Sequence, residues 1–353
     1  MDKSPTGRRG CAVKRICPLL LAALLLAGAA ACGAKEPETA AYAPQESERL
    51  VIYTSHKEEV YWPVVQEFER RTGIWVDVVA GGTNELLERI REEGDSPGAD
   101  VMFGGGVESL ESCRDCFAPY VCAEAEEIQE RFRSPDGLWT PFSALPVALV
   151  YNTKLVPEGG VTGWADLLSP RLRGRIAFAD PAVSGSSFTA LVTMLQAVEG
   201  DEQEILRRFA ENLAGRQLEG SGDVVGSVAG GTDLVGVTLE ETALKHIAAG
   251  DNIALVYPAD GSSCVPDGSA LIRGAAHEEN AKRFLDFTVS REVQSLLAGE
   301  FCRRSVRGDV EPEASMIPLE EIPMADYDVA GASGRRDAVL MSWAFYLGEE
   351  GEP

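Results

Sequence analysis

The chain has 353 residues and a formal net charge of −24 at pH 7, from 56 Asp and Glu against 32 Lys and Arg. A protein this acidic repels polyanions, so we exclude nucleic acid as its partner. The residues from Leu50 onward are numerous enough for two α/β lobes, each with a substantial core.

The first 31 residues are typical of an export signal. A basic segment precedes an apolar run from Ile16 to Ala31, which is too short, and too rich in small residues at its end, to be a membrane span. Residues 1–31 carry five positive side chains and one negative one, so their removal leaves a chain with a net charge near −28. We therefore expect the mature protein to work outside the cytoplasm.

Cys32 directly follows this signal, and the stretch Leu26–Cys32 resembles the lipid-attachment site of bacterial lipoproteins. The resemblance implies a lipid anchor at Cys32, in the periplasm or on the outer face of the cell membrane. An ordinary secreted protein cleaved near Ala31 is the alternative. Residues 32–49 are rich in Ala, Glu and Pro, which predicts a flexible tether.

Strands and helices alternate three times after the tether. Apolar runs predict strands, and amphipathic spacing predicts a helix after each, at 50–53, 59–71, 74–80, 85–92, 99–103 and 107–116. This alternation favours a doubly wound α/β sheet.

The alternation of strands and helices stops at residues 139–146, an extended stretch that contains Pro141 and Pro146. We interpret this stretch as the crossing into a second lobe. Residues 258–266, rich in Gly, Ser and Pro, are the expected return crossing. The remaining elements that we expect are strands at 147–152, 175–179, 234–238 and 253–257, and helices at 164–168, 188–198, 240–249, 278–288, 291–297 and 339–346. The expected organisation is lobe one at 50–146 and 262–300, lobe two at 147–261, and a C-terminal tail at 301–353 packing on the lobes.

The cysteine usage of the chain is consistent with an oxidising compartment. Cys113, Cys116 and Cys122 lie within ten residues of one another. Their spacing occurs in metal and redox sites, but a zinc site needs a fourth ligand and no histidine is near. We expect one local disulfide and one unpaired thiol among the three. Cys264 and Cys302 are a candidate long-range disulfide.

Three loops place small or hydroxyl-bearing residues directly before a predicted helix: Thr54–His56, Gly81–Asn84 and Ser184–Ser187. Helix N-termini attract anions, because their first N–H groups are unpaired and the helix dipole is positive there. In open α/β sheets, ligands bind beyond the carboxyl ends of the strands. Helix capping explains any one such loop, but three of them in two lobes predict an anion site between the lobes.

Further candidates lie at strand ends. Glu240 and Glu241 open a predicted helix, where they either cap it or hold a cationic group of the ligand. Gly105 lies at a strand exit with room for a ligand, and Ser143 lies on the crossing segment. The sequence has no Gly-x-Ser-x-Gly and no convincing Ser–His–Asp set. We therefore expect neither an enzyme nor a cofactor.

Seven stretches together resemble the periplasmic solute-binding proteins of ABC importers, in the branch of ferric-ion, sugar-phosphate and aminoethylphosphonate binders. They are residues 51–56, 99–105, 151–155, 179–187, 257–261, 265–268 and 303–307. The resemblance extends from Leu50 to about Tyr346. It implies the two-lobed type II binding-protein fold, each lobe a doubly wound mixed sheet with flanking helices, closing on its ligand by hinge bending. It also implies a monomer that docks on an ABC permease with its ATPase.

Ferric binders of this branch commonly carry two adjacent tyrosines at the turn that Glu240 and Glu241 occupy here. The resemblance therefore favours a small anionic solute, phosphorylated or phosphonate-bearing, over ferric iron, with a thiamine-type ligand less favoured. The expected ligand-binding residues are Thr54, Ser55, His56, Gly82, Thr83, Gly105, Ser143, Ser184, Ser186, Ser187, Glu240 and Glu241. Three alternatives stay open: ferric iron held by His56, Glu240 and Glu241, an extracellular hydrolase using His56 and a carboxylate, and a structural surface lipoprotein.

Overall fold

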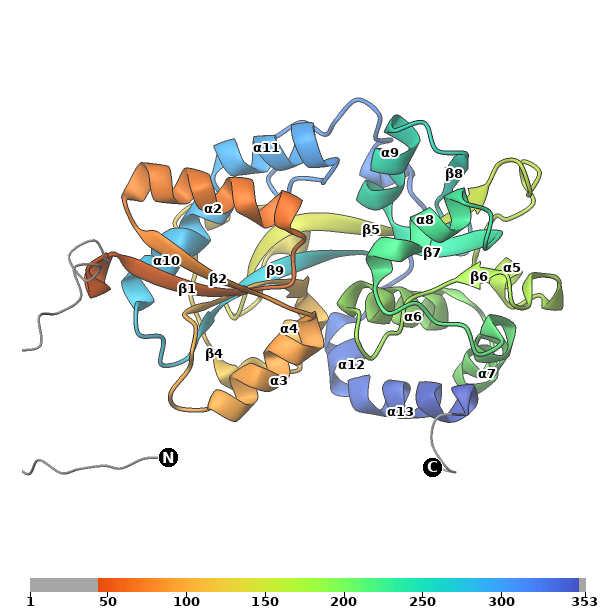
Figure 1. Ribbon diagram of the computed structural model, residues 1–353, viewed down its shortest axis with the longest axis horizontal. Coiled ribbons are helices and arrows are strands. Elements are labelled where there is room, and N and C mark those ends of the chain that lie inside the picture. Colours follow the sequence, from red (N-terminus) through yellow and green to blue (C-terminus); the bar gives the residue numbers. More distant parts are fainter. Residues whose placement is uncertain (1–43, 349–353) are drawn as a thin grey trace, which may run out of the picture. The chain divides into compact units, whose positions relative to one another are not determined.

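The structure is a computed structural model that describes residues 44–348 (Figure 1). The predicted signal, Cys32 and most of the expected tether lie outside the described residues. Among the described residues, none of the helices has the length and apolar character that crossing a bilayer requires.

Within residues 44–348, nine strands form a mixed sheet whose main path runs β2-β1-β3-β9-β5-β7-β6. Strand β1 (Arg49–Thr54) pairs in parallel with β2 (Trp75–Ala80) and with β3 (Val101–Gly106). Strand β9 (Cys264–Ile272) pairs antiparallel with β3 and with β4 (Phe117–Ala118). We call the half that contains these strands the first lobe. The expected mixed α/β sheet is confirmed.

Strand β5 (Thr140–Asn152) joins the two halves, and all thirteen of its residues are buried. Its first part, Thr140–Pro146, pairs with β9. From Val147 on, it pairs with β7 (Val235–Leu239) and β8 (Ile253–Val256), and β7 also pairs with β6 (Ile176–Ala177). We call this half the second lobe. The change of partner lies where the sequence placed the crossing, and the lobe boundaries given above stay a prediction.

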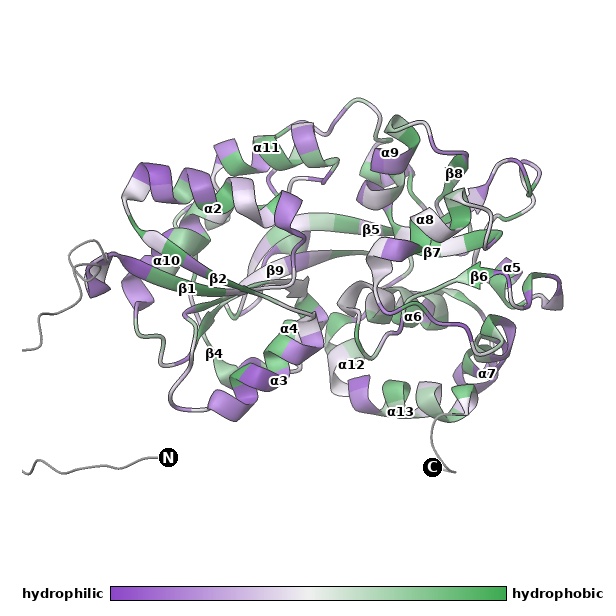
Figure 2. Cartoon of the chain, in the orientation of Figure 1, coloured by the Kyte–Doolittle hydropathy of each residue, from purple (hydrophilic) through white to green (hydrophobic). Residues whose placement is uncertain are grey.

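Helices pack on both halves of the sheet, with their apolar bands turned toward the strands (Figure 2). The first lobe carries α2 (Glu58–Thr72), α3 (Thr83–Glu93), α4 (Val107–Glu111), α10 (Glu278–Thr288) and α11 (Arg291–Phe301). The second carries α5 (Trp164–Leu167), α6 (Gly185–Ala197), α7 (Glu202–Leu213), α8 (Val224–Ala229) and α9 (Glu240–Ala248). Short 3-10 turns occupy Glu46–Glu48, Arg114–Cys116, Ala125–Glu127, Glu130–Phe132, Pro170–Leu172, Ser221–Asp223 and Leu319–Glu321.

The C-terminal segment ends in α12 (Val329–Gly334) and α13 (Arg336–Leu347). Helix α13 lies on α7 of the second lobe, where Trp343 packs against Phe178 and Phe209 with ring centroids 5.8 and 5.6 Å apart. Helix α12 contacts α4 of the first lobe. Helices α12 and α13 of the tail therefore contact both lobes.

Two predictions from the sequence are wrong. The predicted helix 107–116 ends at Glu111 and is followed by a 3-10 turn. The predicted return crossing overlaps β9, which already begins at Cys264. Cys264 and Cys302 are both thiols in the structure, and a disulfide between them stays a prediction. Helices α7, α8 and α12 and strand β4 have no counterpart among the predicted elements.

Candidate solute-binding cavity

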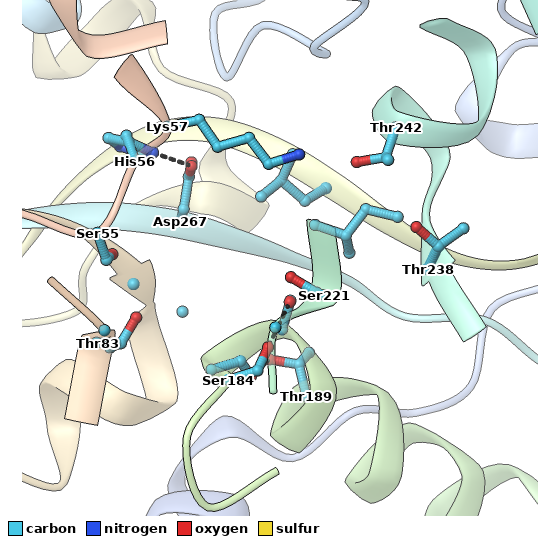
Figure 3. A pocket seen from close by; sticks show the side chains of 18 of the residues that line it. Ser55, His56, Lys57, Thr83, Ser184, Thr189, Ser221, Thr238, Thr242 and Asp267 are labelled. Atoms are coloured by element: carbon cyan, nitrogen blue, oxygen red, sulfur yellow. Dashed lines mark hydrogen bonds and ion pairs between the residues drawn. The ribbon is translucent and has the colours of Figure 1, made fainter. Parts of the chain in front are cut away.

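A cavity of about 250 Å³ lies between the two lobes, lined by residues of both (Figure 3). A cavity of this size suits one small solute. The first lobe contributes the loops after β1 and β2 and the end of β3, and the second contributes the starts of α6 and α9 and the loop before α8. Leu145, Val265, Asp267 and Arg303 complete the lining on the side of the crossing strands.

Eight of the twelve candidate ligand residues line this one cavity: Ser55, His56, Gly82, Thr83, Gly105, Ser184, Ser186 and Glu241. They come from all three loops singled out in the sequence and from the Glu240–Glu241 turn. The reason is topological, because the loops follow the carboxyl ends of strands that pair side by side. Ligand binding by these residues stays a prediction.

The start of α6 is the most polar part of the lining. The Ser184 hydroxyl caps the helix by accepting from the Ser187 N–H at 3.3 Å, and it lies 3.1 Å from the Ser186 hydroxyl. Gly185 and Ser186 lie in the first helical turn, whose N–H groups have no partner within the helix. This end of the helix therefore presents amides and hydroxyls to the cavity.

Two glycines, Gly105 of the first lobe and Gly185 of the second, let the backbone pass close to Thr83. A Cβ atom placed on Gly185 would lie 3.2 Å from the Thr83 hydroxyl oxygen, across the cavity. A Cβ atom on Gly105 would lie 2.7 Å from the Thr83 methyl carbon, and Gly105 has φ +98°, which side chains with a Cβ disfavour. Larger residues at either position would push Thr83 away from the cavity.

Four candidates do not line the cavity, which corrects the sequence-based set. Thr54 is fully buried and donates to the Phe103 carbonyl at 2.8 Å. The Ser143 hydroxyl donates to Asp267 at 2.8 Å, and the Ser187 hydroxyl donates to Ser184. Glu240 accepts two hydrogen bonds from Arg304, at 2.7 and 2.8 Å, and a third from Tyr257. These side chains are already paired within the fold.

A buried charged group forms the wall nearest the crossing strands. Arg303 donates to Asp267 at 2.7 Å and lies 3.7 Å from Glu241. Burial works to raise the pKa of Glu241, but Arg303 and Lys245 outweigh it and hold this pKa below its ordinary value. Glu241 is therefore ionised at neutral pH. Its Oε1 accepts a hydrogen bond from the Thr242 hydroxyl at 2.8 Å, and its Oε2 lies 3.2 Å from the Lys245 ammonium.

His56 lies beside this group, with Nδ1 3.7 Å from Asp267. Burial, assisted by Arg303, lowers the pKa of His56 well below its ordinary value, so the ring is neutral at neutral pH. Its Nε2 is buried and has no partner within the described part of the chain. His56 packs against Phe103 and Phe142, at centroid distances of 4.5 and 4.9 Å. This packing fixes the orientation of the His56 ring, and Nε2 is the ring nitrogen that is left without a hydrogen-bond partner among the described residues.

Lys57 is a lining residue that the sequence-based set misses. Its side chain extends across the cavity toward the second lobe (Figure 3), and Nζ lies 3.8 Å from the position of a Cβ atom on Gly222. It makes no ion pair with another side chain within residues 44–348. A lysine at the N-cap of α2 opposes the helix dipole, and this unfavourable position was the available signal for a functional cation.

No three His, Cys, Asp or Glu side chains gather as metal ligands in the region that the structure describes. Of the alternative ferric set, Glu240 is occupied by Arg304, which leaves His56 and Glu241 on the lining. The residues present therefore suit an anion better than a hard metal ion, which needs several free oxygen donors.

Residues 95–324 match the family model described as bacterial extracellular solute-binding protein. The chain belongs to this family. Similar proteins include iron uptake protein A1 of Synechocystis sp., 26% identical over 284 residues that cover 76% of this chain and 78% of that protein. A putative 2-aminoethylphosphonate-binding periplasmic protein of Salmonella typhimurium is 25% identical over 297 residues, 77% and 83% of the two chains.

Solved structures of this fold include the periplasmic binding protein AfuA of Actinobacillus pleuropneumoniae with fructose-6-phosphate bound. Its TM-score is 0.79 at 24% identity, covering 86% of this chain and 99% of that one. The ferric binding protein of Campylobacter jejuni has a TM-score of 0.74 at 20% identity, covering 84% and 99%. The expected fold and family are confirmed. The relatives are periplasmic, so this solute-binding protein works outside the cytoplasm.

The two lobes of this solute-binding protein contact each other around the cavity. Lys245 of α9 lies 3.0 Å from Glu59 of α2, and the Asn84 amide donates to the Ala182 carbonyl. Thr189 of α6 donates to Glu108 of α4. These contacts define a closed arrangement, in which groups of both lobes surround the cavity.

Proposed function

We propose that this receptor of an ABC importer binds one small anionic solute carrying a phosphate or phosphonate group, and delivers it to the permease. The observation that supports the proposal is the set of donors on the cavity lining. Hydroxyls of Ser55, Thr83 and Ser186, the first amides of α6, and the Lys57 ammonium come from both lobes. Amides and cations at a helix N-terminus are the groups that bind phosphoryl oxygens.

The lining also has acceptors. Glu241 is ionised and lines the cavity, and Thr238 and Thr242 lie on the side of the second lobe (Figure 3). An amine or hydroxyl group of the solute would add a donor to Glu241, whose carboxylate can accept more hydrogen bonds than the one from Thr242 and the ion pair with Lys245 use. We therefore propose a solute with an anionic head and a hydrogen-bond donor at its other end.

Binding requires no covalent step. Because the donors belong to both lobes, only the closed form makes all the contacts, and the solute shifts the equilibrium toward closure. The local dipoles and Lys57 attract an anion although the whole chain is acidic. We propose further that the mature protein is monomeric and is anchored by a lipid at Cys32.

The test is calorimetric titration of the purified mature protein, freed of bound solute by unfolding and refolding. 2-Aminoethylphosphonate and fructose-6-phosphate carry both an anionic head and a donor, and we expect at least one to bind in the micromolar range or tighter. Ethanolamine and fructose lack the anionic head and are the matched controls, which we expect not to bind.

Two results contradict the proposal. Equal affinity for fructose and fructose-6-phosphate, or for ethanolamine and aminoethylphosphonate, would show that the anionic group is not recognised. A visible absorbance band on addition of ferric citrate, lost in Glu241→Ala, together with no binding of either phosphorus compound, would assign the cavity to iron.

A further inference from the structure

The turn that follows α4 brings two cysteines together. The sulfur atoms of Cys113 and Cys116 are 2.7 Å apart, although both are thiols in the structure. The Cys116 N–H donates to the Cys113 carbonyl at 2.9 Å, which closes a four-residue turn. Such a turn holds its end Cα atoms within about 7 Å, and disulfides span Cα distances of about 4.4–6.8 Å. The backbone therefore already has a geometry that accepts a bond between these sulfurs.

The surroundings of the two sulfurs fix one and leave the other accessible. Cys113 is 3% exposed and packs in the core of the first lobe with Leu87 and Leu110, whereas Cys116 is only half-buried. Burial and the neighbouring Cys116 raise the pKa of Cys113 to about 12. A thiol with so little thiolate at neutral pH is a poor nucleophile. This argues for a structural pair rather than a redox-catalytic one.

The other described cysteines offer no competing partner. Cys122, Cys264 and Cys302 are free, and no sulfur contact joins them to another cysteine within residues 44–348. The protein works outside the cytoplasm, where thiols that lie in contact are oxidised.

We propose that Cys113 and Cys116 form a disulfide in the mature protein, which fixes the turn at the end of α4. Each thiol loses a proton, the two sulfurs bond, and the two electrons pass to the disulfide of an extracytoplasmic thiol oxidase, which becomes a dithiol. Helix α4 begins beside Gly106 on the cavity lining and carries Glu108, which contacts Thr189 of the second lobe. The disulfide therefore anchors the far end of a helix that lies at the contact between the lobes.

Arg114 lies between the two cysteines, so trypsin provides a direct test. The protein is exported to a bacterial periplasm, purified without reductant, unfolded, alkylated and digested. Cleavage after Arg91, Arg114 and Arg131 gives the peptides 92–114 and 115–131. We expect mass spectrometry to find them joined, at the sum of their masses less two hydrogens, and separated after reduction.

Because peptide 115–131 also holds Cys122, two variants identify the partner. Cys122→Ser is expected to keep the joined peptides, and Cys116→Ser to abolish them. Alkylation of both Cys113 and Cys116 in the unreduced wild type overturns the proposal, and so does a joined pair that survives in Cys116→Ser. As an independent readout, reduction is expected to lower the melting temperature of the wild type by a few degrees and to leave that of Cys113→Ser/Cys116→Ser unchanged.

Discussion

Polar groups on the two sides of the cavity differ in whether the fold already satisfies them. On the side of the crossing strands, Arg303 pairs with Asp267, and Arg304 pairs with Glu240 just behind the lining. On the side of the loops, Lys57 and the first amides of α6 have no protein partner within residues 44–348. The buried and paired charges hold the lobes together, whereas Lys57, which is exposed and unpaired within the described residues, is available to the solute. The two roles therefore differ both in burial and in partners.

The largest effect is expected from breaking the buried pair. Arg304→Ala leaves Glu240, which is 1% exposed, without its guanidinium, and an uncompensated buried charge costs about 3–5 kcal/mol. We expect the free energy of unfolding, measured by urea titration, to fall by that amount. Arg207→Ala removes an arginine from an exposed ion-pair network on α7, and its unfolding midpoint is expected to stay close to that of the wild type.

The double variant Arg304→Met/Glu240→Leu sharpens this prediction. Replacing both charges by apolar side chains removes the uncompensated charge, so the double variant should be more stable than Arg304→Ala. If Arg304→Ala alone loses less than about 1 kcal/mol, the pair is not what holds α9 to the tail segment.

The next largest effect is expected at Lys57, where a substitution should weaken solute binding and leave stability intact, the opposite of Arg304→Ala. Lys57→Met removes a charged donor from the cavity and should weaken binding of a phosphorus-containing solute by roughly 10- to 150-fold, as for hydrogen bonds to charged groups. Its stability should not decrease, because the lysine opposes the dipole of α2. Calorimetry and thermal melting measure the two quantities. A loss of stability with unchanged affinity would place Lys57 among the structural charges instead.

The fold was largely predictable because its elements have local signals. Helix α10 has the bounds that its amphipathic spacing predicts, 278–288, and α2 differs from its prediction by one residue at each end. Strand β9 was missed in part because Pro266 and Gly268 interrupt a strand pattern. Its position is set by pairing with β3 and β5, which are distant in the sequence.

The part of the site that is formed by loops at strand ends was predictable from the sequence. The three loops after β1, after β2 and before α6 meet at one cavity. The sequence could not separate Glu240 from Glu241, because the difference depends on Arg304, which is 64 residues away. Arg303 was missed for the same reason, since its role depends on Glu241 and Asp267. Lys57 had a local signal, its position at the N-cap of α2, but that signal does not say what lies across the cleft.

A smaller effect, visible only through pH, is expected at His56. Its pKa in the folded protein lies well below that of the unfolded chain, because burial disfavours the charged ring. The unfolded state then binds a proton that the folded state resists, so stability falls as the pH decreases below about 6.5. His56→Gln, measured by urea unfolding between pH 5 and 8, should lose less stability at the acid end than the wild type.

His277 supplies a control of opposite sign. Burial opposes its charge, but Asp100 and Glu46 outweigh burial and raise the pKa of His277. Its stabilising contribution is therefore complete below about pH 6.5 and is lost as the pH rises through its folded-state pKa. His277→Gln should destabilise the protein more at pH 5.5 than at pH 8. Identical pH profiles for both variants would contradict the assigned environments.

The smallest effect separates two adjacent serines at the start of α6. Ser186 lines the cavity, whereas Ser187 is 4% exposed and its hydroxyl donates to Ser184. A neutral hydrogen bond to the solute contributes about 0.5–1.5 kcal/mol, so Ser186→Ala should weaken binding roughly 2- to 13-fold. Ser187→Ala should change the dissociation constant less than twofold and lower the melting temperature slightly instead. Because the two variants remove the same hydroxyl one residue apart, calorimetry on the pair tests whether facing the cavity, rather than lying at a helix N-terminus, decides which polar groups bind the solute.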